Sequence, residues 1–182
     1  LAGRDLLGRG RTGSGKTYAF LLPILARLAP NGTASRAART PRSPRALVVV
    51  PTRELAVQIE AALTPLARSA GLNSLTIFGG VGQSPQVRAL RAGVDIVIAC
   101  PGRLEDLIAQ GECRLDRIEV TVLDEADHMS DLGFLPAVRR ILELTPASGQ
   151  RLLFPATLDA AVAVIVKRYL RNPVTHEADS PE

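Results

Sequence analysis

The chain has 182 residues, which is enough for one well-buried domain and short for two. Hydrophobic residues make up 46% and charged residues 22%, as in ordinary globular proteins, and no apolar run approaches the roughly 20 residues of a membrane span. A membrane partner is therefore not expected, whereas the net charge of +4 favours an anionic partner. The two cysteines are too few for a disulfide framework, which favours a reducing, cytoplasmic compartment. The start at Leu1, without a leader-like segment, favours a fragment over a secreted precursor.

Short apolar runs alternate with longer helical stretches along the chain. Strands are predicted at 5–7, 46–50, 74–78, 94–98, 120–123 and 151–154. Helices are predicted at 16–28, 53–69, 84–92, 103–110, 134–144 and 158–170. Strands that are apolar throughout belong in a parallel sheet covered on both faces. The pattern predicts a doubly wound α/β fold, in which ligands bind at the carboxyl ends of the strands.

Two segments are predicted to lie outside this core. Residues 29–45 contain three prolines, four arginines and no acid, which predicts a mobile basic loop. We interpret it as a solvated insertion, with an auxiliary RNA contact as the alternative. Residues 172–182 are polar and lack a strand pattern, so we expect the domain to occupy 1–171 and a linker to begin after it.

The segment from Gly10 to Thr17 reads GRTGSGKT, which matches the phosphate-loop pattern G-x-x-x-x-G-K-[ST] between a strand and a helix. Its glycines let successive N–H groups face one anion, and the helix start adds its dipole. The chain has 20 arginines but only two lysines, and one of the two is Lys16 in this loop. The residues predicted to hold a nucleoside triphosphate are Arg11, Thr12, Gly13, Ser14, Gly15, Lys16 and Thr17.

The sequence Asp124-Glu-Ala-Asp127 follows the predicted strand at 120–123. A carboxylate in this position can hold the Mg²⁺ of a bound triphosphate, so Asp124 and Thr17 are the predicted metal ligands. Glu125 is the predicted base for the attacking water. Read alone, the acidic turn could simply cap a helix, but a phosphate loop in the same chain favours catalysis.

The order of motifs resembles the first RecA-like domain of a DEAD-box ATP-dependent RNA helicase, over nearly the whole chain. The motifs are GRTGSGKT at 10–17, PTRELA at 51–56, Gly79-Gly80, PGR at 101–103, DEAD at 124–127 and PAT at 155–157. The resemblance implies ATP and Mg²⁺ as cofactors and Lys16, Asp124 and Glu125 as catalytic residues. It also implies a second RecA-like domain as partner, without which the chain is expected to be nearly inactive.

The resemblance assigns further roles. The residues implied to hold an RNA backbone are Pro51, Thr52, Arg53, Glu54, Gly79, Gly80, Pro101, Gly102 and Arg103. Those implied to couple nucleotide state to domain closure are Asp127, Pro155, Ala156 and Thr157. Backbone contacts carry no sequence information, so RNA binding is expected to be sequence-independent and salt-sensitive. Aromatic residues, at 3%, are too few for base stacking to dominate.

The chain departs from the family pattern in three places. Cys100 stands where a Thr is usual before PGR, and a thiol is a weak hydrogen-bond donor. Pro155 replaces the Ser of a Ser-Ala-Thr motif, which predicts that Asp127 loses a partner and that unwinding suffers more than ATP binding. Only nine residues precede Gly10, so the family's adenine-reading glutamine motif is not among them. Two alternatives remain open: a catalytically idle binding module, and a DNA helicase built on the same core.

Overall fold

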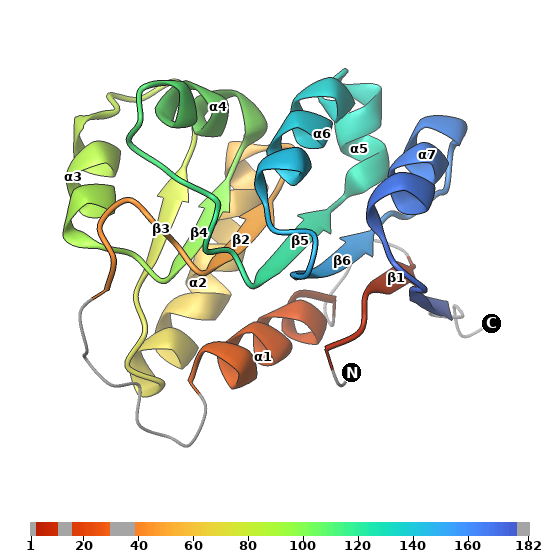
Figure 1. Cartoon of the computed structure of the whole chain (residues 1–182), viewed down its shortest axis with the longest axis horizontal. Helices are drawn as coiled ribbons and strands as arrows, with labels where there is room; N and C mark the ends of the chain where they lie inside the picture. The colour runs from red at the N-terminus through yellow and green to blue at the C-terminus, as the bar shows by residue number, and fades with distance from the viewer. Residues whose placement is uncertain (1–2, 11–15, 30–38, 178–182) are drawn as a thin grey trace.

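The computed structural model describes residues 3–10, 16–29 and 39–177 (Figure 1). The strands are β1 (Leu6–Arg9), β2 (Ala46–Val49), β3 (Ser74–Ile77), β4 (Ile96–Ala99), β5 (Val120–Asp124), β6 (Gln150–Phe154) and β7 (Val174–Glu177). The helices are α1 (Lys16–Leu28), α2 (Arg53–Ser69), α3 (Ser84–Ala92), α4 (Pro101–Ala109), α5 (Ala126–Asp131), α6 (Leu135–Leu144) and α7 (Ala160–Tyr169). None of the helices in these ranges is both long and apolar enough to cross a membrane.

The strands form one 7-stranded sheet in the order β3-β4-β2-β5-β6-β1-β7, in which every neighbouring pair is parallel. The predicted α/β fold with a parallel sheet is confirmed. Strand β2 lies near the middle, where Leu47 is in register with Val97 on one side and Thr121 on the other. All four residues of β2 are buried, because the sheet is covered on both faces.

Successive residues of each central strand point into two separate apolar layers. Ala46 and Val48 pack with the buried faces of α1 and α2, while Leu47 and Val49 pack with those of α3 to α7. This alternation follows from the period of two in a strand. Burial on both faces explains why the sequence of β2 is apolar throughout and not alternating.

The main differences from the prediction lie at the margins of the sheet and in one short helix. Residues 172–182 were predicted to begin a linker, but Val174–Glu177 form β7, which pairs with β1. This edge strand is mostly exposed, so its sequence lacks an apolar run. The prediction also missed α5, and it placed the start of α4 at residue 103, whereas α4 starts at Pro101. Proline suits a first helical position because its missing N–H would have no partner there.

The prediction of a mobile loop at 29–45 is wrong for its second half, residues 39–45; residues 30–38 lie outside the described ranges. Arg39 pairs with Asp95 at 2.7 Å, Arg42 with Glu112 at 3.2 Å and Arg45 with Glu119 at 2.7 Å. Ser43 and Pro44 between them are buried. The basic residues of this stretch therefore neutralise carboxylates of the same domain, which argues against the alternative of an RNA contact there.

Candidate functional site

The parallel sheet brings the predicted motifs to a single edge. Because all strands run in the same direction, their carboxyl ends lie together. The segments that follow β1 to β6 at this edge are Gly10, Pro51–Glu54, Gly79–Gly80, Cys100–Arg103, Glu125–Asp127 and Pro155–Thr157. These segments come from positions throughout the chain, so the fold and not the sequence makes them neighbours.

The phosphate-loop motif ends in the first turn of α1. Residues Arg11, Thr12, Gly13, Ser14 and Gly15 lie outside the described ranges. Lys16 is the first residue of α1, is partly buried, and donates a hydrogen bond from Nζ to the carbonyl oxygen of Gly10. Its ammonium group is thereby held beside Gly10, which directly follows β1. Thr17, the next residue, is also partly buried in this first turn.

Asp124 and Glu125 stand at the end of the central strand β5. Asp124 is 6% exposed, and its Oδ1 accepts a hydrogen bond of 3.0 Å from the N–H of Glu125. Glu125 adopts a left-handed conformation with φ 52°, which is uncommon for a residue with a side chain and turns the chain from β5 into α5. Burial, assisted by the charge of Glu125, raises the pKa of Asp124 to about 6, while the charge of Lys16 opposes this shift. The structure thus brings Lys16 near the Asp124–Glu125 pair.

A buried carboxylate of this kind favours a bound cation. Its ionised form is disfavoured by burial and by a neighbouring carboxylate, and a cation would relieve both effects. In the described part of the chain no cluster of three His, Cys, Asp or Glu side chains forms a self-sufficient metal site. This donor set fits Mg²⁺, which takes few protein ligands and completes its shell with phosphate oxygens and water.

The same burial predicts that Asp124→Asn stabilises the nucleotide-free chain. The folded-state pKa of about 6 exceeds the unfolded value of about 3.9, so stability is lost as the pH rises from about 4 through 6. At about pH 7.5 the variant is expected to gain on the order of 2 kcal/mol in the free energy of unfolding. Urea unfolding with EDTA at about pH 7.5 and pH 4 measures this. A variant no more stable than wild type at the higher pH would contradict it.

Asp127 contacts the segment that follows β6. It accepts hydrogen bonds from the N–H of Ala156 at 3.1 Å, from the N–H of Thr157 at 3.2 Å and from the Thr157 hydroxyl at 3.2 Å. Partial burial would raise the pKa of Asp127, but the N–H groups of Ala156 and Thr157 lower it below its usual value. Pro155 offers Asp127 no hydroxyl, but the N–H groups of Ala156 and Thr157 and the Thr157 hydroxyl serve as its partners. Pro155 itself is buried.

The segment after β2 is held by capping and by an aromatic ring. The Thr52 hydroxyl accepts from the N–H of Leu55 at 3.2 Å and caps α2. The Arg53 guanidinium lies 4.8 Å from the centre of the ring of Phe78, the residue that directly precedes Gly79. Glu54 is exposed and Pro51 is buried. This segment and the loop after β3 are therefore in direct contact.

Cys100 lies close to the PTRE segment, at the start of α4. Burial, followed by the charge of Glu54, raises the pKa of the Cys100 thiol to about 11. Cys100 makes no side-chain cap to α4. The thiol is therefore neutral at physiological pH and does not add a charge to this edge.

The glycine doublet and the PGR segment present open backbone. A Cβ atom built at Gly79, Gly80 or Gly102 would meet nothing within 4 Å. Gly80 has a φ of +78°, a conformation that favours glycine. Arg103 reaches toward this loop and donates to the carbonyl oxygen of Val81 at 2.9 Å. The segments after β2, β3 and β4 thus form one continuous group of polar backbone and arginines.

Sequence reasoning missed two contributors to this group, Phe78 and Gln86. Phe78 appeared only as the end of a strand, yet its ring supports Arg53. Gln86 lies on the buried side of α3 and bonds both Arg103 and the Phe78 carbonyl. A polar residue at a core position of an amphipathic helix is the one signal that could have pointed to it.

Fold and site together define a nucleotide-binding α/β domain with a second group of ligand-facing segments on the same edge. A family model for the DEAD/DEAH box helicase matches residues 1–165, and the chain belongs to this family. It is 44% identical over 183 residues to ATP-dependent RNA helicase RhlB of Pseudomonas syringae pv. tomato, covering 99% of this chain and 46% of that protein. It is 43% identical over 175 residues to the chloroplastic DEAD-box ATP-dependent RNA helicase 3A of Zea mays, covering 96% and 23% respectively.

Two solved structures are similar to this chain in both fold and sequence. A hypothetical ATP-dependent RNA helicase from Sulfolobus tokodaii superposes with a TM-score of 0.84 at 33% identity, covering 97% of this chain and 49% of that one. A DEAD box protein from Methanococcus jannaschii gives 0.82 at 30% identity, covering 97% and 46%. The chain therefore spans less than half the length of each of these relatives.

Proposed function

We propose that this chain is the ATP-binding and RNA-binding half of an ATP-dependent RNA helicase that unwinds or remodels RNA. The observation that carries the proposal is the convergence of two groups on one sheet edge. Lys16, Asp124 and Glu125 form the first group, and the open backbone around Gly80 and Arg103 belongs to the second. Asp127 and the segment after β6 lie at the same edge, where their hydrogen bonds join the segment after β5 to the segment after β6.

In the nucleotide group, Lys16 would bind the outer phosphates of ATP through its ammonium group. Asp124 and Thr17 would hold Mg²⁺, which when bound draws negative charge from the phosphates and orients them. Glu125 would accept the proton of the attacking water from its place between β5 and α5. Burial of Asp124 lowers the local dielectric, so each of these charges acts strongly.

In the RNA group, the open segments at Gly79–Gly80 and Gly102 would let a sugar-phosphate backbone approach closely. Arg53 and Arg103 would supply positive charge, and the N–H groups at the starts of α2 and α4 would supply donors. Such contacts read the backbone and not the bases, so binding is expected to be largely sequence-independent and to weaken with salt.

The partner of this edge would be a second RecA-like domain, because the arginines that complete phosphate hydrolysis in this class come from it. We therefore expect slow ATP hydrolysis by the chain alone. A cytoplasmic location agrees with two free cysteines, of which Cys113 is buried. Adenine specificity would come from a motif that residues 1–9 do not supply.

Calorimetric titration of Mg-ADP and Mg-ATP tests the nucleotide part of this proposal. We expect Lys16→Ala to weaken Mg-ATP binding by about tenfold to a hundredfold, because it removes a charge-assisted contact to phosphate. Lys167→Ala serves as the matched control, since Lys167 is exposed near the end of α7, and it is expected to bind like wild type. Equal affinity of Lys16→Ala and wild type would overturn the assignment of the phosphate loop.

A further inference from the structure

Gln86 is a polar side chain in a core position. It is 6% exposed and shares the buried side of α3 with Leu90. An amide buried without hydrogen bonds is costly, so its partners explain why the residue is tolerated there. Both ends of the Gln86 amide have such partners.

The Gln86 amide joins two segments of the RNA group. Its Nε2 donates to the carbonyl oxygen of Phe78 at 3.1 Å, and its Oε1 accepts from Nη1 of Arg103 at 3.2 Å. Nη2 of Arg103 donates in turn to the carbonyl oxygen of Val81 at 2.9 Å. The loop that contains the glycine doublet is thus bonded just before and just after the doublet, and Arg103 is fixed against it.

The hydrogen bonds that hold Arg103 do not neutralise its positive charge. Its two hydrogen-bond partners are uncharged oxygens, and within the described ranges no carboxylate pairs with it. Two other arginines contact carboxylates instead: Arg91 pairs with Glu112, and Arg140 pairs with Glu105 of α4. A guanidinium has five N–H donors, so Arg103 keeps free donors as well as its full charge.

We infer that Gln86 is a positioning residue, which holds Arg103 and the loop at 78–81 in one arrangement for the RNA backbone without neutralising the arginine. The inference rests on the proposed RNA-binding function of this edge. An amide is suited to the task because it donates and accepts at once. Leucine would remove both bonds. Glutamate would hold Arg103 but would neutralise it and repel the Phe78 carbonyl.

The test measures binding of a short fluorescein-labelled oligouridylate to the full chain by fluorescence anisotropy at low salt. Gln86→Leu and Gln86→Glu are each expected to weaken RNA binding by about threefold to tenfold. The matched control is Gln110→Leu, which removes an exposed amide pair between Gln83 and Gln110 and leaves Arg103 untouched. The control is expected to bind RNA like wild type, and all variants are expected to bind Mg-ADP equally.

A double-mutant cycle with Arg103→Ala separates positioning from a general loss of structure. If Gln86 acts through Arg103, Gln86→Leu adds no further loss of RNA affinity in the Arg103→Ala background. Wild-type RNA affinity in Gln86→Leu and Gln86→Glu, or fully additive losses, would overturn the inference. If Gln86→Leu does not fold, the nearly isosteric Gln86→Glu decides it. Absence of RNA binding by the wild-type chain would instead overturn the proposed function together with the inference.

Discussion

Replacement of Glu125 by Gln is expected to slow RNA-stimulated ATP hydrolysis by the full-length protein about 10²- to 10⁴-fold, with little change in Mg-ATP affinity. The change removes the base that accepts a proton from water but keeps the shape of the side chain. It also keeps the N–H that donates to Asp124 at 3.0 Å, so the turn from β5 into α5 is preserved. Phosphate release at saturating RNA and ATP measures the rate, and calorimetry measures the affinity.

Glu60→Gln is a matched control for this experiment, because it makes the same chemical change in the middle of α2. It is expected to hydrolyse ATP at the wild-type rate. Unchanged hydrolysis by Glu125→Gln would contradict the role of Glu125 as the base. Mg-ATP binding without hydrolysis by the wild-type full-length protein would favour the alternative of an idle binding module.

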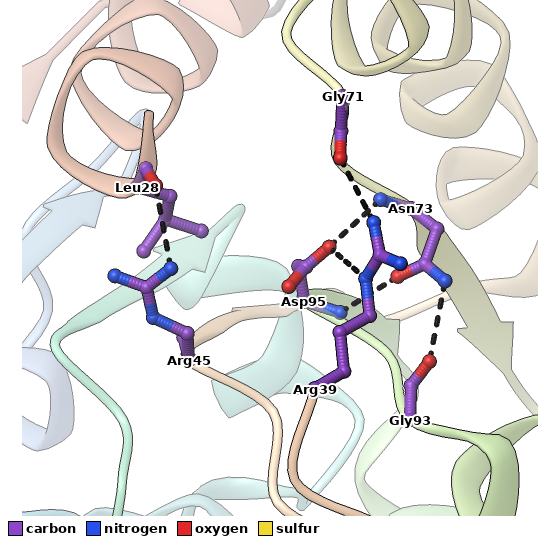
Figure 2. A network of polar contacts seen from close by, with 7 residues as sticks. All are labelled: Leu28, Arg39, Arg45, Gly71, Asn73, Gly93 and Asp95. Carbon is purple, nitrogen blue, oxygen red and sulfur yellow. Dashed lines mark hydrogen bonds and ion pairs between the residues drawn. The ribbon is translucent and has the colours of Figure 1, made fainter. Parts of the chain in front are cut away.

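Replacement of Asp95 by Ala is expected to lower the free energy of unfolding by about 3 kcal/mol. Asp95 is buried, and its Oδ2 accepts from Nε of Arg39 at 2.7 Å and from the N–H of Asn73 at 2.9 Å (Figure 2). Oδ1 of Asn73 accepts from the N–H of Asp95 at 3.0 Å, and Nδ2 of Asn73 donates to the carbonyl oxygen of Gly93. Alanine would remove this buried carboxylate and leave two donors without it, the N–H of Asn73 and Nε of Arg39.

Urea unfolding of the chain measures this loss. Arg39→Ala is the informative comparison, because Arg39 is partly exposed and its loss leaves the bond from Asn73 to Asp95 in place. We expect its cost to be about 1 kcal/mol, clearly below that of Asp95→Ala. A loss below about 1 kcal/mol for Asp95→Ala, or equal losses for both variants, would contradict the central role of Asp95.

Much of the fold could be predicted because its strands are buried on both faces. The runs around Val48, Ile98 and Val122 are apolar throughout, and that pattern predicts a parallel sheet. Strand β7 escaped prediction because an exposed edge strand needs no apolar pattern. Helix α5 escaped because it is short and begins after a left-handed Glu125, which no local periodicity reveals.

The candidate site also contains residues that the sequence could predict and residues that it could not. The residues in motifs with fixed spacing, such as Lys16 and Asp124, could be named from the sequence because the chemistry of phosphate binding requires those types in that order. Gln86 could not, because its partners lie on a preceding loop and on α4. The ion pairs of Arg39 and Arg45 were also unpredicted, since their acidic partners lie 56 and 74 positions away.

The position of β1 in the sheet has a consequence for folding during synthesis. Strand β1 is made before the other strands of this sheet, but its partners are β6 and β7, with Leu6 in register with Leu152 and Val174. Strands β2 to β5 can pair with one another much earlier. The strand that leads into the phosphate loop is therefore among the last to join the sheet. A nascent chain that still lacks β6 and β7 has no partner strands for β1, so it cannot yet position the phosphate loop for ATP.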